Sequence, residues 1–140
     1  MVTLLNLEYL NKYKSLKASY VKNCLTHLPR NYQKLDISVV FVNRKKIKEL
    51  NKEFRDIDKP TDVLSFQIDE NVNEIYICPE YIYASYRGKM FEEEILRMIV
   101  HGVLHIYGLD HKGKFDHLRA DSEEMFKVQE DILHKIMKKV

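Results

Sequence analysis

Three histidines in the second half of the chain place the strongest constraint on how it can fold. His101, His105 and His111 lie in the run His-Gly-Val-Leu-His-Ile-Tyr-Gly-Leu-Asp-His. On a helix, positions i and i+4 share one face, so His101 and His105 can point at a single ion. Gly108 can adopt a left-handed conformation, end the helix and return His111 to the same ion. Three imidazoles leave the fourth position of a tetrahedral metal open, as in a catalytic zinc site.

The residue after the first histidine separates this run from a protease motif with the same histidine spacing. Metzincin proteases carry His-Glu-x-x-His-x-x-Gly-x-x-His, in which the glutamate acts as general base. Here that position is Gly102, which can neither take nor give a proton. The pattern therefore predicts a zinc hydrolase, and the missing base argues against proteolysis.

Two motifs, one at residues 50–66 and one at residues 101–111, resemble those of the YbeY family of bacterial metal-dependent endoribonucleases. The histidine run matches the family signature His-Gly-x-Leu-His-x-x-Gly-x-Asp-His. Residues 50–66 are similar to a second family pattern, which consists of an asparagine, an aromatic-arginine pair and Pro-Thr-Asp-Val-Leu-Ser-Phe. In this chain these elements are Asn51, Phe54-Arg55 and residues 60–66. The resemblance extends over roughly residues 35–135.

This resemblance implies a metal-dependent endoribonuclease that prefers single-stranded RNA. It would act in ribosomal RNA maturation, at the 3′ end of the small-subunit RNA, and in ribosome quality control. Its implied partners are ribosomal RNA, small ribosomal subunit proteins and an assembly GTPase. The three histidines would hold one Zn²⁺ per chain, and nickel or another divalent metal is an alternative that imidazole ligands also suit.

Further site residues are predicted from their charge and position. Arg55 is expected to be catalytic, because its fork of donors matches a phosphate and can stabilise charge in the transition state. The arginine of the similar family motif is also implicated in activity; the alternative is a surface arginine paired with Asp56 or Asp58. Asp110 is expected to hold an imidazole N–H and so orient that ring, with a turn-capping role as the alternative. The expected RNA-binding lysines are Lys45, Lys48, Lys52 and Lys59.

The charge of the chain is unevenly distributed along its length. Residues 1–60 contain 13 Lys and Arg against 6 Asp and Glu, a balance of +7. Residues 61–140 contain 10 against 15, a balance of −5, which leaves a net charge of +2. A basic surface beside a metal site would attract a phosphate backbone. The alternative is that these lysines form an ordinary solvent-exposed helix face.

Length and composition predict one domain over residues 1–140, with a core of its own. No apolar run approaches the length of a membrane span and no signal segment is present, so we expect a cytoplasmic protein that is neither membrane-bound nor exported. Cys24 and Cys78 are isolated, which predicts two reduced thiols in or near the core. No Gly-rich phosphate loop occurs, so no nucleotide cofactor is expected.

Hydrophobic periodicity predicts a single α+β domain in which helices cover a small mixed sheet and a zincin-like metal-bearing helix is central. In residue numbers, the expected helices are 5–28, 44–54, 79–87, 91–107 and 116–139, and the expected strands are 37–42, 63–68 and 74–78, with 2–5 as a candidate edge strand. In the helix at 44–54, Ile47, Leu50 and Phe54 fall on one apolar face.

The chain departs from the family pattern at two places, where Asn73-Glu74 replaces a Gly-Asp pair and Leu109 replaces an aromatic residue or histidine. Three functions remain open: the endoribonuclease, a ribosome-assembly factor whose metal is structural, and a metal-dependent hydrolase of another substrate. An open coordination position favours the first, because structural zinc sites are normally closed by a fourth protein ligand. A fourth ligand from Asp110 or His117 would favour the second.

Overall fold

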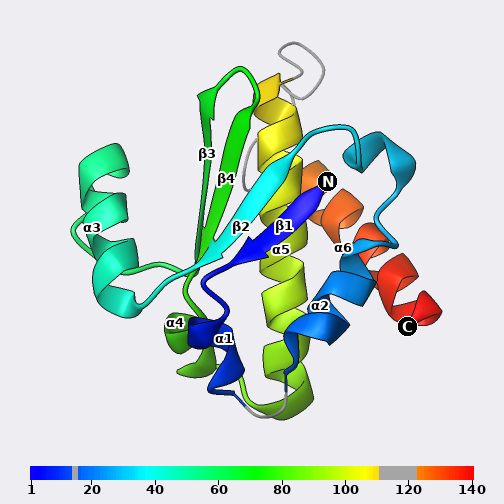
Figure 1. Cartoon of the computed structure of the whole chain (residues 1–140), viewed down its shortest axis with the longest axis horizontal. Helices are drawn as coiled ribbons and strands as arrows, with labels where there is room; N and C mark the ends of the chain where they lie inside the picture. Colours follow the sequence, from blue (N-terminus) through cyan, green and yellow to red (C-terminus); the bar gives the residue numbers. More distant parts are fainter. Residues whose placement is uncertain (14–15, 111–122) are drawn as a thin grey trace.

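The computed structural model describes residues 1–13, 16–110 and 123–140 (Figure 1). The elements in chain order are β1 (Val2–Leu5), α1 (Glu8–Asn11), α2 (Ala18–Leu25), the 3₁₀ turn η1 (Arg30–Tyr32), β2 (Ile37–Phe41), α3 (Arg44–Arg55), β3 (Val63–Asp69), β4 (Val72–Ile77), α4 (Pro79–Tyr83), α5 (Gly88–Asp110) and α6 (Glu123–Lys139).

The four strands form one mixed sheet in the order β1-β2-β4-β3. The first three of these run parallel, and β3 pairs antiparallel to β4. At the centre, Val39 of β2 is opposite Ile75 of β4, which in turn is opposite Ser65 of β3. β1 and β3 are the edge strands. The α+β class, the mixed sheet and the candidate edge strand at residues 2–5 are thus confirmed.

Each face of the sheet packs against helices through its own apolar cluster. On one face, α5 contributes fully buried residues such as Ile99 to a large cluster that includes Ile75 of β4. α6 packs along α5, and α2 packs against α6. On the opposite face, α3 contributes Ile47 and Leu50 to a smaller cluster with Leu64 of β3. Figure 1 shows α3 and α5 on opposite sides of the sheet.

The two cysteines lie in different parts of this core. Cys24 of α2 belongs to the larger cluster, and Cys78 belongs to the smaller one. Both are free thiols, and burial raises the pKa of each above its usual value. This confirms the prediction of reduced, buried cysteines and argues against a reactive thiolate at either position.

The prediction of one long helix over residues 5–28 is wrong. The chain turns at Asn6, which has a φ of 58°, and Lys17 before α2 is extended, with φ and ψ of −101° and 140°. Residues 2–5 pair with β2, so the first helix begins only after that strand. The extended backbone at Lys17 then separates the two short helices α1 and α2. The helical spacing was misleading because Leu10 of α1 and Val21 of α2 are both buried in the same core.

The boundaries of α5 also differ from the prediction. The helix begins at Gly88, where φ is 59°, and continues through Gly108 to Asp110. Gly108 therefore does not end the helix, which corrects the expected turn at that residue. Glycine permits a left-handed conformation without requiring it. Tyr107, just before Gly108 in the helix, is buried and fixes this part of α5. Its Oη accepts hydrogen bonds from the backbone N–H groups of Lys34 and Leu35 at 2.8 and 3.0 Å.

The remaining boundaries differ by a few residues. α4 ends at Tyr83, earlier than expected, and the turn between β3 and β4 is shorter than predicted. α6 is described from Glu123 onward, so the first part of the helix predicted at 116–139 lies outside the described residues. Across the described ranges, no helix is both long enough and apolar enough to cross a membrane.

Candidate metal centre

His101 and His105 meet on one face of α5, one helical turn apart. Their Nε2 atoms are 3.1 Å apart, and the ring centroids are separated by 4.6 Å with an interplanar angle of 67°. Two nitrogen ligands of one tetrahedral Zn²⁺ lie about 3.3 Å from each other, given Zn–N bonds near 2.0–2.1 Å. Both rings are half-buried. This donor pair therefore fits zinc in chemistry and in spacing.

The third predicted ligand lies outside the described residues. His111 follows directly after Asp110, the last residue of α5, and the side chain of Asp110 is also not described. Within residues 1–13, 16–110 and 123–140, no cluster of three His, Cys, Asp or Glu side chains is suited to a metal ion. The completion of the site by His111, and the orienting role of Asp110, stay predictions.

The tautomer of His101 is determined by a hydrogen-bond partner on α6. Gln129, which is 4% exposed, places Oε1 2.7 Å from His101 Nδ1. The orientation of the amide is fixed because its Nε2 donates to Glu130 Oε2 at 3.1 Å. Since an amide oxygen only accepts, His101 carries its proton on Nδ1 and directs the lone pair of Nε2 toward His105. That is the tautomer that a metal ligand requires.

Glu130 is held in turn by Arg97, one turn before His101 on α5. Arg97 Nε donates to Glu130 Oε2 at 2.9 Å, and its Nη1 donates to Glu94 Oε1 at 2.6 Å. Burial would raise the pKa of Glu130, but hydrogen bonds from Arg97 and Gln129 outweigh it and hold that pKa below its usual value. A continuous chain of polar contacts therefore runs from Arg97 to the histidine pair.

Sequence reasoning missed this polar chain. The sequence offers one indication of it, because Gln129 is a polar residue that directly follows the apolar Val128 in the last helix. Arg97 also lies at i−4 from His101 and therefore shares its helix face. Glu93 and Glu94, near the start of α5, both form ion pairs with Arg97.

Gly102 lies where α5 comes closest to the sheet. A Cβ atom at this position would lie 2.7 Å from Cγ2 and 2.8 Å from Cδ1 of Ile75, which is fully buried. A glutamate would need still more room at the same place. Close packing of helix on strand thus explains why the residue after His101 is glycine, and it agrees with the prediction that this chain lacks the protease base.

Arg55 is the last residue of α3 and is exposed to solvent. No ion pair or hydrogen bond of its side chain is found among the described residues. Asp56 pairs with Lys52 at 3.2 Å and Asp58 with Lys48 at 3.9 Å. The alternative in which Arg55 pairs with Asp56 or Asp58 is therefore wrong, and its guanidinium is available to a ligand.

The four lysines predicted to bind RNA are all exposed on or just after α3, but two of them already have acidic neighbours. Lys48 and Lys52 form the ion pairs described above. The backbone carbonyl of Lys59 accepts a hydrogen bond from Asn51 Nδ2 at 2.8 Å, which fixes the loop after α3. Lys45, Lys48 and Lys52 lie on α3, and Figure 1 shows α3 on the opposite side of the sheet from α5, the helix that carries His101 and His105.

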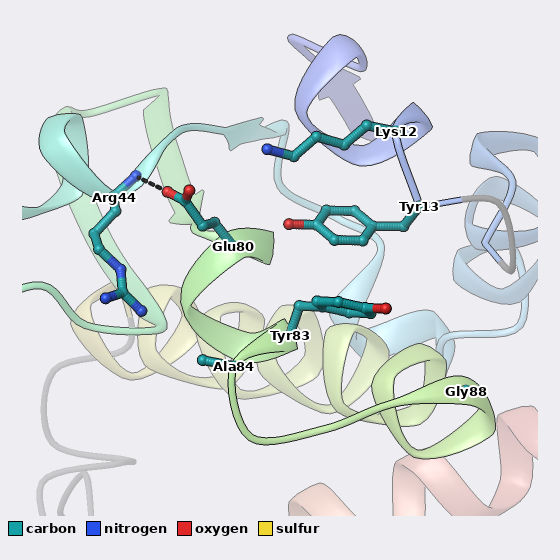
Figure 2. Close-up of a pocket in the computed structure, with 7 residues that line it drawn as sticks. All are labelled: Lys12, Tyr13, Arg44, Glu80, Tyr83, Ala84 and Gly88. Carbon is teal, nitrogen blue, oxygen red and sulfur yellow. Dashed lines mark hydrogen bonds between the residues drawn. The ribbon is translucent and has the colours of Figure 1, made fainter.

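A separate cleft of about 840 Å³ lies near the start of α5 (Figure 2). Glu80 accepts a hydrogen bond there from the backbone N–H of Arg44 at 3.1 Å. Figure 2 shows its carboxylate facing the cleft together with Lys12 and Tyr13. Neither His101 nor His105 lines this cleft. Because positive and negative groups share its walls, it does not select a phosphate.

Comparison with known proteins identifies relatives of this chain in sequence and in fold. The family model described as endoribonuclease YbeY matches residues 6–137. An endoribonuclease YbeY from Acholeplasma laidlawii is 35% identical over 137 residues, covering 94% of this chain and 96% of the relative. One from Thermotoga maritima is 39% identical over 104 residues, covering 71% and 67%. A Thermotoga maritima protein solved in solution superposes with a TM-score of 0.57 at 30% identity, over 99% of this chain and 91% of that one.

The fold and these matches define a small α+β protein of the endoribonuclease class, in which this chain carries a pair of histidines on the long helix α5. The chain belongs to the endoribonuclease YbeY family.

Proposed function

We propose that this protein is a zinc-dependent endoribonuclease that cleaves single-stranded RNA. Its membership of the endoribonuclease YbeY family supports the reaction class. The observation that carries the metal dependence is the His101–His105 pair, with its Nε2 atoms 3.1 Å apart and the tautomer of His101 fixed by Gln129. Zn²⁺ is the proposed ion, and nickel is the next candidate because imidazole suits both.

His101, His105 and His111 would hold the ion. When bound, zinc supplies a Lewis acid toward the phosphodiester. Gln129 Oε1 accepts a hydrogen bond from His101 Nδ1–H, which leaves the lone pair of Nε2 available to the metal. Asp110 would orient one of the other rings in the same way.

Arg55 would bind a phosphate oxygen and stabilise the charge that develops during cleavage. It lies at the end of α3, and the histidines lie on α5.

The finer biological assignment is part of the same proposal. The substrate would be ribosomal RNA, cut during maturation of the small-subunit 3′ end in the cytoplasm, with small ribosomal subunit proteins and an assembly GTPase as partners. The two alternatives are an assembly factor with a structural metal and a hydrolase of another substrate. Peptide hydrolysis is disfavoured because close packing against Ile75 excludes a glutamate at position 102.

Cleavage of a labelled single-stranded RNA by untagged protein tests this proposal, with bound metal quantified in every sample. His105→Ala is expected to lose both metal and cleavage, because one of the three ligands is gone. Arg55→Ala is expected to keep the metal and lose cleavage. The matched controls are His134→Ala and Arg30→Ala, since both residues are exposed and lie outside the proposed site.

Each outcome separates the alternatives. If all variants cut equally, the activity belongs to a contaminating nuclease and the proposal is wrong. If the wild type holds one metal per chain and cuts no RNA, the assembly-factor alternative replaces it. Equal loss of cleavage in Arg30→Ala and Arg55→Ala would remove the specific role of Arg55.

A further inference from the structure

The apolar face of α3 is not buried along its whole length. Ile47 and Leu50 are 0% and 7% exposed, as expected for a helix face that packs on a sheet. Phe54, one turn further on the same face, is 59% exposed. The apolar surface of this ring is therefore available to a ligand at the end of α3.

Phe54 is the exposed end of a row of three aromatic rings, Phe54, Phe66 and Tyr76. The centroids of Phe54 and Phe66 are 4.9 Å apart at an interplanar angle of 50°, and those of Phe66 and Tyr76 are 5.9 Å apart at 64°. Phe66 and Tyr76 are half-buried against the smaller cluster. The inner rings are thus fixed by the sheet, and they support Phe54 in a defined place.

Arg55, the residue that follows Phe54 on α3, provides an uncompensated cation at the same exposed end of the helix. Its side chain has no ion pair among the described residues, whereas Lys48 and Lys52 of the same helix are paired with acidic groups. An exposed ring next to an available guanidinium matches the two chemical parts of a nucleotide. The base can stack on the ring, and the phosphate can bind the arginine.

We propose that Phe54 is a stacking platform for one unpaired base of a single-stranded RNA whose adjacent phosphate binds Arg55. This inference rests on the proposed function and adds how the RNA is held on the α3 side of the sheet. A base inside a duplex is already stacked on both faces, so the platform selects unpaired nucleotides. The cation beside the ring favours a nucleic acid over an apolar peptide as its occupant.

Binding of a labelled U-rich 2′-O-methyl oligonucleotide tests the platform without cleavage, using fluorescence anisotropy and the full chain. Phe54→Ala is expected to weaken binding by about tenfold, because stacking on one aromatic ring contributes about 1–3 kcal/mol. Phe54→Tyr keeps a ring and is expected to bind like the wild type. Phe126→Ala is the matched control, since Phe126 of α6 is 60% exposed.

A second oligonucleotide with abasic sites separates stacking from phosphate binding. Phe54→Ala is expected to bind it as the wild type does, because no base remains to stack. Arg55→Gln is expected to weaken binding of both oligonucleotides and to reduce the slope of log affinity against log salt by about 0.7, the value for one phosphate of a single strand. Circular dichroism verifies that each variant is folded.

Three results would overturn the platform. Phe54→Ala could bind the oligonucleotide as tightly as Phe126→Ala, while Arg55→Ala still abolishes cleavage; the proposed function would then stand without the platform. Phe54→Ala could weaken the abasic and base-containing oligonucleotides equally, which would exclude stacking. The wild type could form a dimer that Phe54→Ala dissociates, and the ring would then be covered by a second copy of the chain.

Discussion

The two faces of the sheet treat their charged groups differently. On the α5 face, Arg97 is 23% exposed and is surrounded by carboxylates from two helices, and the polar chain it starts ends at His101. On the α3 face, Lys52 is 57% exposed and pairs only with Asp56, four residues along the same helix. One face holds its polar side chains in fixed positions, and the other presents them to solvent.

This difference suggests a division of labour within the proposed enzyme. A metal ligand must be held in one orientation and one tautomer, which the packed α5–α6 interface provides. RNA binding instead requires cations and a ring that a flexible strand can reach, which the open end of α3 provides. Substitutions on the α5 face should therefore change stability and metal affinity, and those on the α3 face should change RNA binding.

We expect the largest effect on stability from replacing Arg97, the cation that pairs with Glu94 and Glu130 on the α5 face. Arg97→Met keeps an aliphatic side chain and leaves Glu94, which is 7% exposed, without its cation. We expect a loss of about 2–4 kcal/mol in the free energy of unfolding, because a buried carboxylate is left unpaired. Lys52→Met is the matched change on the other face, with an expected loss of about 0.5 kcal/mol or less. Urea unfolding measures both, and equal losses would contradict the comparison.

Gln129 allows the effect on the metal to be separated from the effect on the fold. Gln129→Leu removes the acceptor for His101 Nδ1 and is expected to weaken zinc affinity about 10- to 100-fold, as for other outer-shell partners. His134→Ala, at an exposed position of the same helix, is the matched control and is expected to retain affinity. Competition with a chromophoric chelator measures the affinity without any activity assay. If Gln129→Leu binds zinc as tightly as the wild type, the glutamine does not position the ligand.

The close approach of α5 to the sheet can be tested through Gly102. Gly102→Ala should gain some helix propensity but force Cβ against Ile75, with a net loss of about 1–2 kcal/mol in stability. In an Ile75→Ala background, the added methyl group enters free space, and the same change should be neutral or stabilising. A double-mutant cycle by urea unfolding gives the coupling. Additive losses would show that the contact does not explain this glycine.

Sequence reasoning succeeded where a local pattern and the tertiary fold agree. The spacing of His101 and His105 correctly predicted that they meet on one helix face, and the β-branched run at residues 37–42 correctly predicted a buried strand. It failed where the outcome depends on packing between distant segments. Two short N-terminal helices gave the periodicity of one long helix, because Leu10 and Val21 are buried in the same core.

The same limit applies to the candidate site. Gln129 is 28 positions from His101 along the chain, so their hydrogen bond follows from how α6 packs on α5, which no local motif encodes. Phe54 is the opposite case, because its spacing predicted a core residue, and its ring contacts Phe66 of β3 but stays 59% exposed. Where a local prediction of burial fails in this way, the exposed residue is a candidate for binding.

The smallest expected effect is an acid-dependent loss of stability on the α5 face. The pKa of Glu130 lies below the ordinary glutamate value of 4.5, so its ionised form is favoured by the fold. Its stabilising contribution is therefore fully present above about pH 4.5 and is lost as the pH falls through the lower, folded-state pKa. Glu130→Gln should flatten the dependence of unfolding free energy on pH in this acidic range. Urea unfolding in buffers between pH 3 and pH 6 would reveal the difference, and parallel curves for Glu130→Gln and the wild type would show that the Arg97–Glu130 pair contributes nothing that depends on ionisation.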